Sequence, residues 1–307
     1  MAEIAIEAEG LRKVFAKDVV AVDGLDLQVP RGAVYGLIGR NAVGKTTTIR
    51  LLMGLLRPTA GTARVLGADM WTAQPVKRAR VAYVAQIQQL HDWMSLQELC
   101  HYLSHFYERW DQGYARDLAG RFDIPWDRQV GLLSGGQQRK VSIVLAFAAR
   151  PEVLLLDEPA AGLDPIARRE LVEELVDLLS RDVDCTVLFS THIISDLERI
   201  AEYVGIMDNG RMVASQRLDE LQSQTKRVQV VFDGTAPPPD FSIPGALRSE
   251  ASGPVVTAVV RLASEAQLDP VRRLPGVRVN VFPLGLEDIF FELFGPKARQ
   301  ELTGERQ

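Results

Sequence analysis

Residues 39–46 read Gly-Arg-Asn-Ala-Val-Gly-Lys-Thr, which matches the pattern GxxxxGK followed by Ser or Thr. The octet comes directly after the apolar run 34–38 and opens a segment with helical character. In such a loop the backbone N–H groups surround phosphate oxygens, Lys45 neutralises their charge, and the Thr46 hydroxyl reaches Mg²⁺. We therefore predict a nucleotide-phosphate site whose binding residues are Gly39, Arg40, Asn41, Ala42, Val43, Gly44, Lys45, Thr46 and Thr47.

Two adjacent carboxylates, Asp157 and Glu158, follow the apolar run 153–156. In open α/β sheets, ligands bind at the edge where the strands end. At that edge Asp157 can hold Mg²⁺ through its water shell, and Glu158 can polarise the water that attacks a terminal phosphate. An isolated Asp-Glu pair is more often a solvated turn, but beside a phosphate loop the pair predicts hydrolysis of ATP.

The elements that must position these residues alternate between strand and helix. This alternation implies a parallel sheet covered by helices, and hence an α/β fold. Residues 4–9 and 25–29 alternate apolar and polar side chains, as half-buried strands do. The predicted strands of the parallel sheet are 34–38, 81–84, 153–156 and 186–189, and the predicted helical segments are 46–56, 95–122, 137–149 and 165–180.

The composition of the chain changes near residue 225. We expect one domain over residues 1–225 and a small α+β accessory domain over residues 226–307. The segment LEDIFFELF at 286–294 is apolar at helical spacing. Further strands of the small domain are expected at 225–232, 255–262 and 277–282, with a proline-rich loop at 236–240.

The overall composition sets limits on where such a protein works. Hydrophobic residues make up 47% and charged residues 24%, which is typical of a globular chain. The net charge of −5 argues against a nucleic-acid partner. No apolar run approaches the roughly 20 residues of a membrane span, and the N-terminus has no basic signal region. Cys100 and Cys185 lack the spacing of a metal site. We expect a cytoplasmic protein.

A third motif, Leu-Ser-Gly-Gly-Gln at 133–137, stands between the phosphate loop and the carboxylate pair. The three motifs in this order resemble the ATPase domain of ABC proteins, and the resemblance covers residues 4 to about 220. It implies a P-loop NTPase fold of the ABC ATPase type, with a RecA-like core, an antiparallel β subdomain and an α-helical subdomain at about 90–150. It also implies ATP and Mg²⁺ as cofactors.

Further residues match motifs of this family in the expected order. Gln86 resembles the Q-loop glutamine that senses Mg²⁺ and the membrane partner, Asp164 resembles the D-loop aspartate, and His192 resembles the switch histidine. Phe15 stands where the family places an aromatic ring under the adenine. The implied catalytic residues are Glu158, His192 and Gln86, and the implied metal-site residues are Thr46, Gln86 and Asp157.

The resemblance explains why the motif at 133–137 lies far along the chain from the phosphate loop. Two ATPase subunits, identical or different, are expected to pack head to tail, so that the motif of one caps the ATP held by the other. The capping residues are Ser134, Gly135, Gly136 and Gln137. They begin a helix, whose first N–H groups suit a γ-phosphate.

Within the family, the chain most resembles bacterial ATPases that pair with ABC-2-type permeases. The resembling stretches are Val22-Asp-Gly-Leu, residues 50–58 and residues 285–293. The resemblance implies an exporter whose permease is a separate chain, with the ATPase held on the inner face of the cell membrane. The alternative is a soluble ABC ATPase that acts on nucleic acid or the ribosome. Such relatives typically have two ATPase domains, zinc cysteines or a long coiled coil, and the sequence has none of these.

Three features stay open. Ala42 stands where relatives usually have glycine, and if the position needs a positive φ, the β-carbon costs roughly 1 kcal/mol. The apolar face of 286–294 covers either the sheet of its own small domain or the second subunit. Five aromatic residues either fill the core of the helical subdomain or form a groove for a permease helix: Trp93, Tyr102, Phe106, Tyr107 and Trp110.

Overall fold

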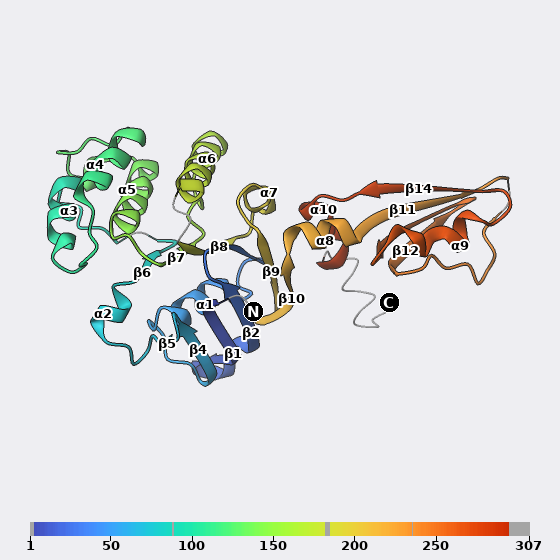
Figure 1. Cartoon of the computed structure of the whole chain (residues 1–307), viewed down its shortest axis with the longest axis horizontal. Coiled ribbons are helices and arrows are strands. Elements are labelled where there is room, and N and C mark those ends of the chain that lie inside the picture. Colours follow the sequence, from blue (N-terminus) through green and yellow to red (C-terminus); the bar gives the residue numbers. More distant parts are fainter. Residues whose placement is uncertain (1–2, 88, 182–184, 235, 295–307) are drawn as a thin grey trace. The chain divides into compact units, whose positions relative to one another are not determined.

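The computed structural model describes residues 3–87, 89–181, 185–234 and 236–294 (Figure 1). The chain divides into two compact units, residues 1–215 and 216–307. Each unit buries an apolar core of its own, which is formed largely by the strands of its sheets.

The centre of the first unit is a six-stranded sheet with the order β10-β9-β3-β8-β7-β6 (Figure 1). The five strands from β9 to β6 run parallel to one another. Strands β3, β7 and β8 are almost wholly buried, as is usual for apolar strands between layers of helices. The bounds are β3 Val34–Ile38, β6 Val81–Val84, β7 Val153–Asp157, β8 Thr186–Thr191, β9 Tyr203–Asp208 and β10 Arg211–Arg217. The predicted parallel sheet is confirmed, and β9 and β10 extend it.

A second sheet of the first unit is antiparallel and has the order β2-β1-β4-β5. The bounds are β1 Ile4–Phe15, β2 Val19–Pro30, β4 Ala60–Val65 and β5 Ala68–Asp69. The strands expected at 4–9 and 25–29 are therefore too short, because β1 and β2 stay paired as far as Phe15 and Val19. This sheet corresponds to the antiparallel β subdomain that the family resemblance implies.

Three helices of the first unit lie together: α3 Leu96–Ser104, α4 Gln112–Arg121 and α5 Gly135–Ala148 (Figure 1). The first and last of them begin with a capping box. The side chains of Ser95 and Ser134 each accept the backbone N–H of the residue three positions later. The side chains of those residues, Glu98 and Gln137, accept the backbone N–H of the serine in turn. This cap starts α5 at Gly135 rather than at the predicted Gln137.

Helix α1, which follows the phosphate loop, spans Lys45–Leu52 and ends before the predicted residue 56. Gly54 has a φ of 67°, and the Leu55 N–H bonds back to the Arg50 carbonyl at 2.9 Å, which closes the helix. A β-carbon at Gly54 would lie 2.2 Å from the Met70 carbonyl oxygen, so this position requires glycine. The other helices of the unit are α2 Pro75–Arg78, α6 Pro165–Arg181 and α7 Ile194–Glu198.

The second unit is built on a four-stranded antiparallel sheet with the order β12-β13-β11-β14. One face buries alternate residues of β11, Val228, Val230 and Phe232, against Leu268 and Val271. The strands are β11 Thr225–Phe232, β12 Ala246–Ser252, β13 Val255–Arg261 and β14 Val277–Pro283, and the helices are α8 Leu218–Gln224, α9 Asp269–Arg272 and α10 Leu286–Phe294.

The second unit begins at Gln216 rather than at the expected residue 226. Helix α8 belongs to it because the Gln224 carbonyl accepts the Leu262 N–H at 2.8 Å, and Gln216 accepts a bond from Arg261 at 2.6 Å. The end of β13 and the residue after it thereby hold the segment that the sequence assigned to the first domain.

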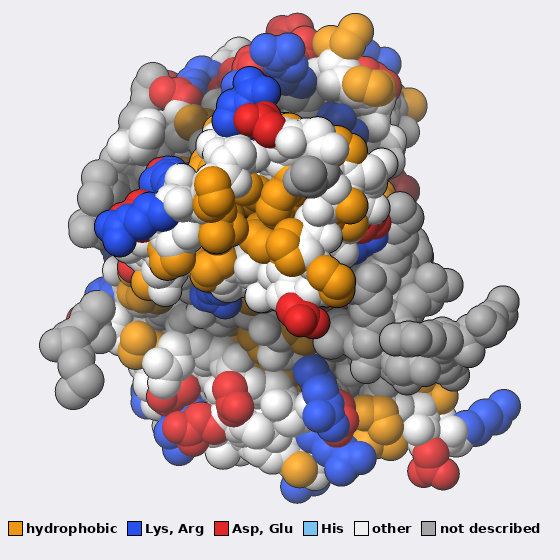
Figure 2. Space-filling view, turned by 90° about the vertical axis from the view of Figure 1, so that its right-hand side faces the viewer, with side chains coloured by type: hydrophobic (Ala, Val, Ile, Leu, Met, Phe, Trp, Pro, Cys, Tyr) orange, Lys and Arg blue, Asp and Glu red, His pale blue; other side chains and the backbone are white. Residues whose placement is uncertain are grey.

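The burial of its side chains indicates which part of helix α10 is covered within the chain. Leu286 and Ile289 are fully buried, whereas Phe291 is 65% exposed. The side chains of Leu293 and Phe294, which complete the predicted face, lie outside the described residues. Figure 2 shows apolar side chains gathered on the face that is turned to the viewer, with charged side chains around them.

Candidate nucleotide site

The phosphate loop connects β3 to α1, and glycine is required at two of its positions. A β-carbon at Gly39 would lie 2.7 Å from the Met207 carbonyl oxygen. Gly44 has a φ of 109°, and a β-carbon there would lie 2.3 Å from the Ala21 carbonyl oxygen. The glycines of the motif therefore let the loop pass close to the neighbouring backbone.

Ala42, the residue that replaces a customary glycine, has a φ of 65°. The backbone at this position is thus in the left-handed region, as we expected from the glycine that relatives usually have there. A residue with a β-carbon costs roughly 1 kcal/mol there relative to glycine. Ala42 is exposed, so its methyl group gains little from burial in return.

Lys45 lies buried at the centre of the loop. Its Nζ atom donates to the carbonyl oxygens of Gly39 at 2.7 Å and Arg40 at 3.1 Å. It also forms an ion pair with Oε1 of Glu158 at 3.2 Å. One ammonium group therefore joins the phosphate loop to the carboxylate at the end of β7.

Asp157 ends β7 and is fully buried. Its Oδ1 atom accepts hydrogen bonds from the Thr46 hydroxyl at 3.0 Å and the Ser190 hydroxyl at 2.9 Å. Burial raises the pKa of this carboxyl group, and the two hydroxyl donors oppose that effect. Thr46 and Asp157, predicted to share a metal site, are in direct contact.

Glu158 follows in a left-handed conformation with a φ of 46°. Its N–H donates to the Ser190 hydroxyl at 3.0 Å and to the Ser190 carbonyl at 3.1 Å. Its Oε2 atom lies 3.0 Å from Nδ1 of His192 and 3.4 Å from Nε2 of Gln86. The three residues with an implied catalytic role, Gln86, Glu158 and His192, therefore meet at one carboxylate.

Two residues that the sequence analysis did not single out support this arrangement. Ser190, on β8, bonds both Asp157 and the backbone of Glu158. Arg139, on α5, donates to the carbonyl oxygens of Gln86 at 3.1 Å and Glu158 at 3.4 Å. Burial lowers the pKa of Arg139. The only feature of the sequence that could have indicated Arg139 is its position on α5, the helix that begins directly after Ser134.

A cavity of about 350 Å³ opens at the loop. Phe15 forms part of its wall, is 42% exposed, and has the Lys13 ammonium 5.3 Å from its ring centroid. The aromatic ring expected beneath an adenine thus lines the same cavity as the phosphate loop. The lining residues are Phe15, Val19, Ala21, Asn41, Ala42, Gly44, Lys45, Thr46, Thr47, Gln86 and Glu158.

The motif at 133–137 and Asp164 are not among the residues that line this cavity. Ser134 caps α5, and its side chain is exposed. The Oδ1 atom of Asp164 accepts the N–H groups of Ile166 at 3.0 Å and Ala167 at 3.1 Å, where α6 begins. Within one chain, therefore, Ser134 and Asp164 act as helix caps and do not line the nucleotide cavity.

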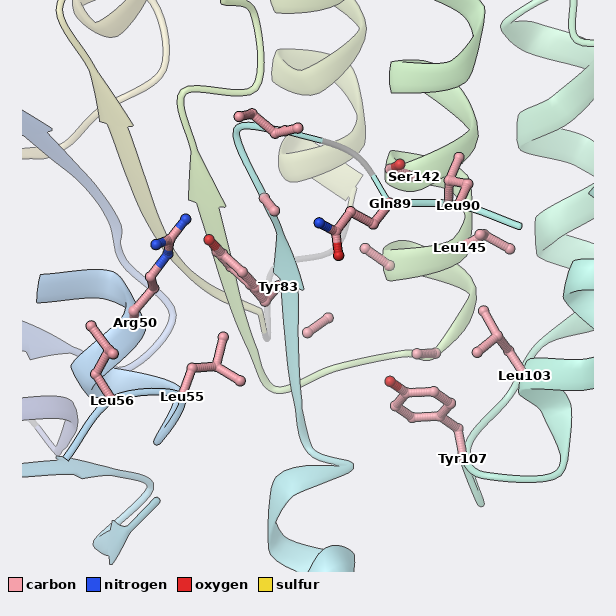
Figure 3. Close-up of a pocket in the computed structure, with 15 residues that line it drawn as sticks. Arg50, Leu55, Leu56, Tyr83, Gln89, Leu90, Leu103, Tyr107, Ser142 and Leu145 are labelled. Carbon is pink, nitrogen blue, oxygen red and sulfur yellow. The ribbon is translucent and has the colours of Figure 1, made fainter. Parts of the chain in front are cut away.

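A second cavity of about 620 Å³ lies between α1, β6, α3 and α5 (Figure 3). Arg50 and Tyr83 stand on one side of it, and Leu103 and Tyr107 stand on the other. The sequence left open whether five aromatic residues fill the helical subdomain or form a groove. Two of them, Trp93 and Tyr102, line a third cavity, and Phe106 is 60% exposed. Trp93, Tyr102 and Phe106 are exposed, whereas Tyr107 and Trp110 are half-buried, so none of the five is fully enclosed in the helical subdomain.

Comparison with known proteins decides the family. The model of the ABC transporter family matches residues 22–161. A Nod factor export ATP-binding protein of Cupriavidus metallidurans is 33% identical over 302 residues, which covers 96% of this chain and 98% of that protein. The chain belongs to the ABC transporter family.

Other relatives agree with this assignment. The daunorubicin resistance ATP-binding protein DrrA3 of Streptomyces coeruleorubidus is 36% identical over 239 residues, covering 76% of this chain and 75% of that protein. A solved structure of an ATP-binding subunit of an ABC transporter has 28% identity and a TM-score of 0.64, covering 72% of this chain and 92% of that one. None of these names supports the alternative of an ATPase that acts on nucleic acid.

As an ABC ATPase subunit, the chain binds and hydrolyses ATP to power a transporter. The fold is the expected P-loop NTPase fold of the ABC type, with the candidate nucleotide site at the carboxyl edge of the parallel sheet. Among the helices that the structure describes, none has the length and apolar character needed to cross a bilayer.

Proposed function

We propose that this ABC ATPase drives an ABC-2-type exporter, and that its permease is a separate polypeptide. The names of the relatives support export, since one is a Nod factor export protein and another a daunorubicin resistance protein. The match to the export relative runs over 96% of this chain, including the second unit. Through the permease, the ATPase would lie on the inner face of the cell membrane.

The observation that carries the proposed chemistry is the meeting of Lys45, Gln86 and His192 at the Glu158 carboxylate. Glu158 is the base that orients and polarises the water attacking the γ-phosphate. His192 and Gln86 hold its Oε2 atom, and Lys45 pairs with its Oε1 atom. Lys45 neutralises phosphate charge, and Phe15 stacks under the adenine.

The residues present fit Mg²⁺. Asp157 and Thr46 offer hard oxygen atoms 3.0 Å apart, and the side chain of Gln86 contacts the neighbouring Glu158. No cluster of three or more His, Cys, Asp or Glu side chains suited to a metal occurs among the described residues. The pair of Asp157 and Thr46 suits Mg²⁺ that is held jointly by one carboxylate, one hydroxyl and the nucleotide phosphates. There the ion would neutralise charge on the phosphates.

A second subunit completes the nucleotide site in this proposal. Ser134, Gly135, Gly136 and Gln137 would reach the γ-phosphate from the opposite subunit, and Asp164 would lie at the same junction. The exposed N-terminus of α5 supports this, since Ser134 and Gly135 are exposed and do not line the nucleotide cavity of their own chain.

The permease would insert a cytoplasmic helix into the cavity of Figure 3. Its lining is mainly apolar, with Leu55, Leu56, Leu90, Leu103 and Leu145 around it, which suits the apolar face of a helix. Ala85 and Ile87, which flank Gln86 in the chain, also line this cavity. An inserted helix would therefore act on the segment that carries Gln86.

Co-expression tests this function. The chain and an ABC-2-type permease encoded beside it should co-purify in detergent, and ATP turnover should rise in lipid nanodiscs relative to the free chain. Leu103→Asp, which places a charge in the cavity, should abolish co-purification, whereas Phe291→Ser, in the second unit, serves as the matched control. A permease that binds the Leu103→Asp variant as well as the natural chain would contradict the docking proposal.

A further inference from the structure

The two carboxylate oxygens of Asp157 face different surroundings. Oδ1 accepts from Thr46 and Ser190, both within the nucleotide site. Oδ2 lies 3.4 Å from the hydroxyl of Tyr83, at the long end of hydrogen-bond range. Tyr83 is on β6, the strand beside β7, and it lines the cavity of Figure 3 rather than the nucleotide cavity. One side chain therefore joins that cavity to the carboxylate that was predicted to hold Mg²⁺.

Tyr83 is suited to act as a hydrogen-bond donor. The ordinary pKa of a tyrosine is about 10, so at neutral pH the hydroxyl carries its proton. A protonated hydroxyl has one hydrogen to give, and the Asp157 carboxylate is an acceptor. The bond would hold Oδ2 in place while Oδ1 remains bound to Thr46 and Ser190.

Arg50 stands at the cavity end of this contact. It is an exposed residue of α1, the helix that also carries Lys45 and Thr46. Arg50 and Tyr83 both line the cavity of Figure 3. Figure 3 shows the Arg50 guanidinium and the Tyr83 hydroxyl turned towards each other at one wall of the cavity.

We propose that Tyr83 is a positioning residue for the metal-holding carboxylate, and that Arg50 orients it from the cavity. The Tyr83 hydroxyl fixes the rotation of the Asp157 carboxyl group, so that the carboxylate meets Mg²⁺ and its water in one geometry. Because Arg50 and Tyr83 both line the cavity, an occupant that contacts them alters this geometry directly. This route does not pass through Gln86. The inference rests on the proposed role of Asp157 at Mg²⁺.

The full chain offers a matched pair of variants. Tyr83→Phe removes only the hydroxyl and keeps the ring, while Tyr107→Phe removes the hydroxyl of the other tyrosine in the same cavity, for which no contact with Asp157 is seen among the described residues. Affinity for a fluorescent ATP analogue is measured in EDTA and over a titration of free Mg²⁺. The melting temperature is recorded for every variant.

For Tyr83→Phe, we expect unchanged affinity in EDTA and a half-saturating Mg²⁺ concentration about three- to tenfold higher, since one bond to a charged acceptor is lost. Arg50→Met should shift the Mg²⁺ titration in the same direction by a smaller factor. Tyr107→Phe should leave the titration unchanged. If Tyr83→Phe does not fold, the Arg50→Met titration decides.

Three outcomes would overturn the proposal: an unchanged Mg²⁺ titration for Tyr83→Phe, an equal shift for Tyr107→Phe, or an equal loss of affinity in EDTA. Asp157→Asn separates this failure from that of the proposed function. If Asp157→Asn removes the Mg²⁺ dependence and Tyr83→Phe does not change it, only the positioning role is wrong. If Asp157→Asn also leaves the dependence intact, the proposed metal site itself is wrong.

Discussion

The Nδ1 atom of His192 lies 3.0 Å from Oε2 of Glu158, although 34 positions separate the two residues in the chain. The contact follows from the fold, since Glu158 directly follows β7, His192 directly follows β8, and the two strands are parallel neighbours. Parallel strands bring their carboxyl ends to the same edge of a sheet, where open α/β folds bind ligands.

His192→Ala should therefore lower kcat for ATP hydrolysis by about a hundredfold, because the catalytic carboxylate loses a partner that holds it. The Kd for ATP should stay within a factor of a few, since His192 is not among the lining residues of the nucleotide cavity. His105→Ala, an exposed residue just after α3, is the control and should keep full turnover. Equal turnover in both variants would exclude His192 from the reaction.

Arg139→Met should reduce kcat about tenfold, because two backbone carbonyls, those of Gln86 and Glu158, lose a charged donor. The expected effect falls on turnover and not on ATP affinity, since Arg139 does not line the nucleotide cavity. Lys140→Met, the next residue of α5, is the matched control: its ammonium lies over the Phe122 ring at 5.6 Å. Steady-state kinetics that change KM alone would rule out a positioning role for Arg139.

Ala42→Gly should tighten ATP binding by up to about tenfold, which corresponds to about 1 kcal/mol of relieved backbone strain at a φ of 65°. Gly44→Ala should act in the opposite direction, because its β-carbon would lie 2.3 Å from the Ala21 carbonyl oxygen. Isothermal titration with ATP measures both. An affinity for Ala42→Gly equal to that of the natural chain would mean that the loop accommodates alanine without strain.

A chain cut after Ser215 should keep its ATP-dependent association. The first unit contains every residue of the nucleotide cavity, and Leu286 and Ile289 of α10 are already buried in the full chain. Size-exclusion chromatography with and without ATP makes the comparison. If the full chain runs as a dimer without ATP and the shortened chain as a monomer, the apolar face of α10 ties the subunits together instead.

Much of the first unit was predictable because its strands are short apolar runs bounded by turn residues. The runs at 34–38 and 81–84 became β3 and β6 with unchanged bounds. The end of α1 was misplaced, because it depends on a left-handed Gly54 that packs against Met70, a contact the sequence does not reveal. The division between the two units falls at Ser215 and Gln216, earlier in the chain than the change of composition near residue 225, because Arg261 and Leu262 bond Gln216 and Gln224 from far along the chain.

The candidate site was predictable where a motif carries the chemistry and not where a neighbour supports it. Lys45, Asp157 and Glu158 stand in recognisable patterns, so their types and spacing indicated phosphate and metal chemistry. Ser190 and Tyr83 were missed because an isolated serine or tyrosine within a strand has no distinguishing pattern. Only the pairing of β8 and β6 with β7 brings them to Asp157.

The central claim, that Glu158 is the base of an ABC-type ATPase, is tested most directly by Glu158→Gln. The amide keeps the size of the side chain but cannot act as a base, so turnover should fall by two or more decades while ATP binding persists. The variant should also accumulate as an ATP-bound dimer, seen as a shift on a size-exclusion column. Unchanged turnover together with an unshifted monomer would contradict the account.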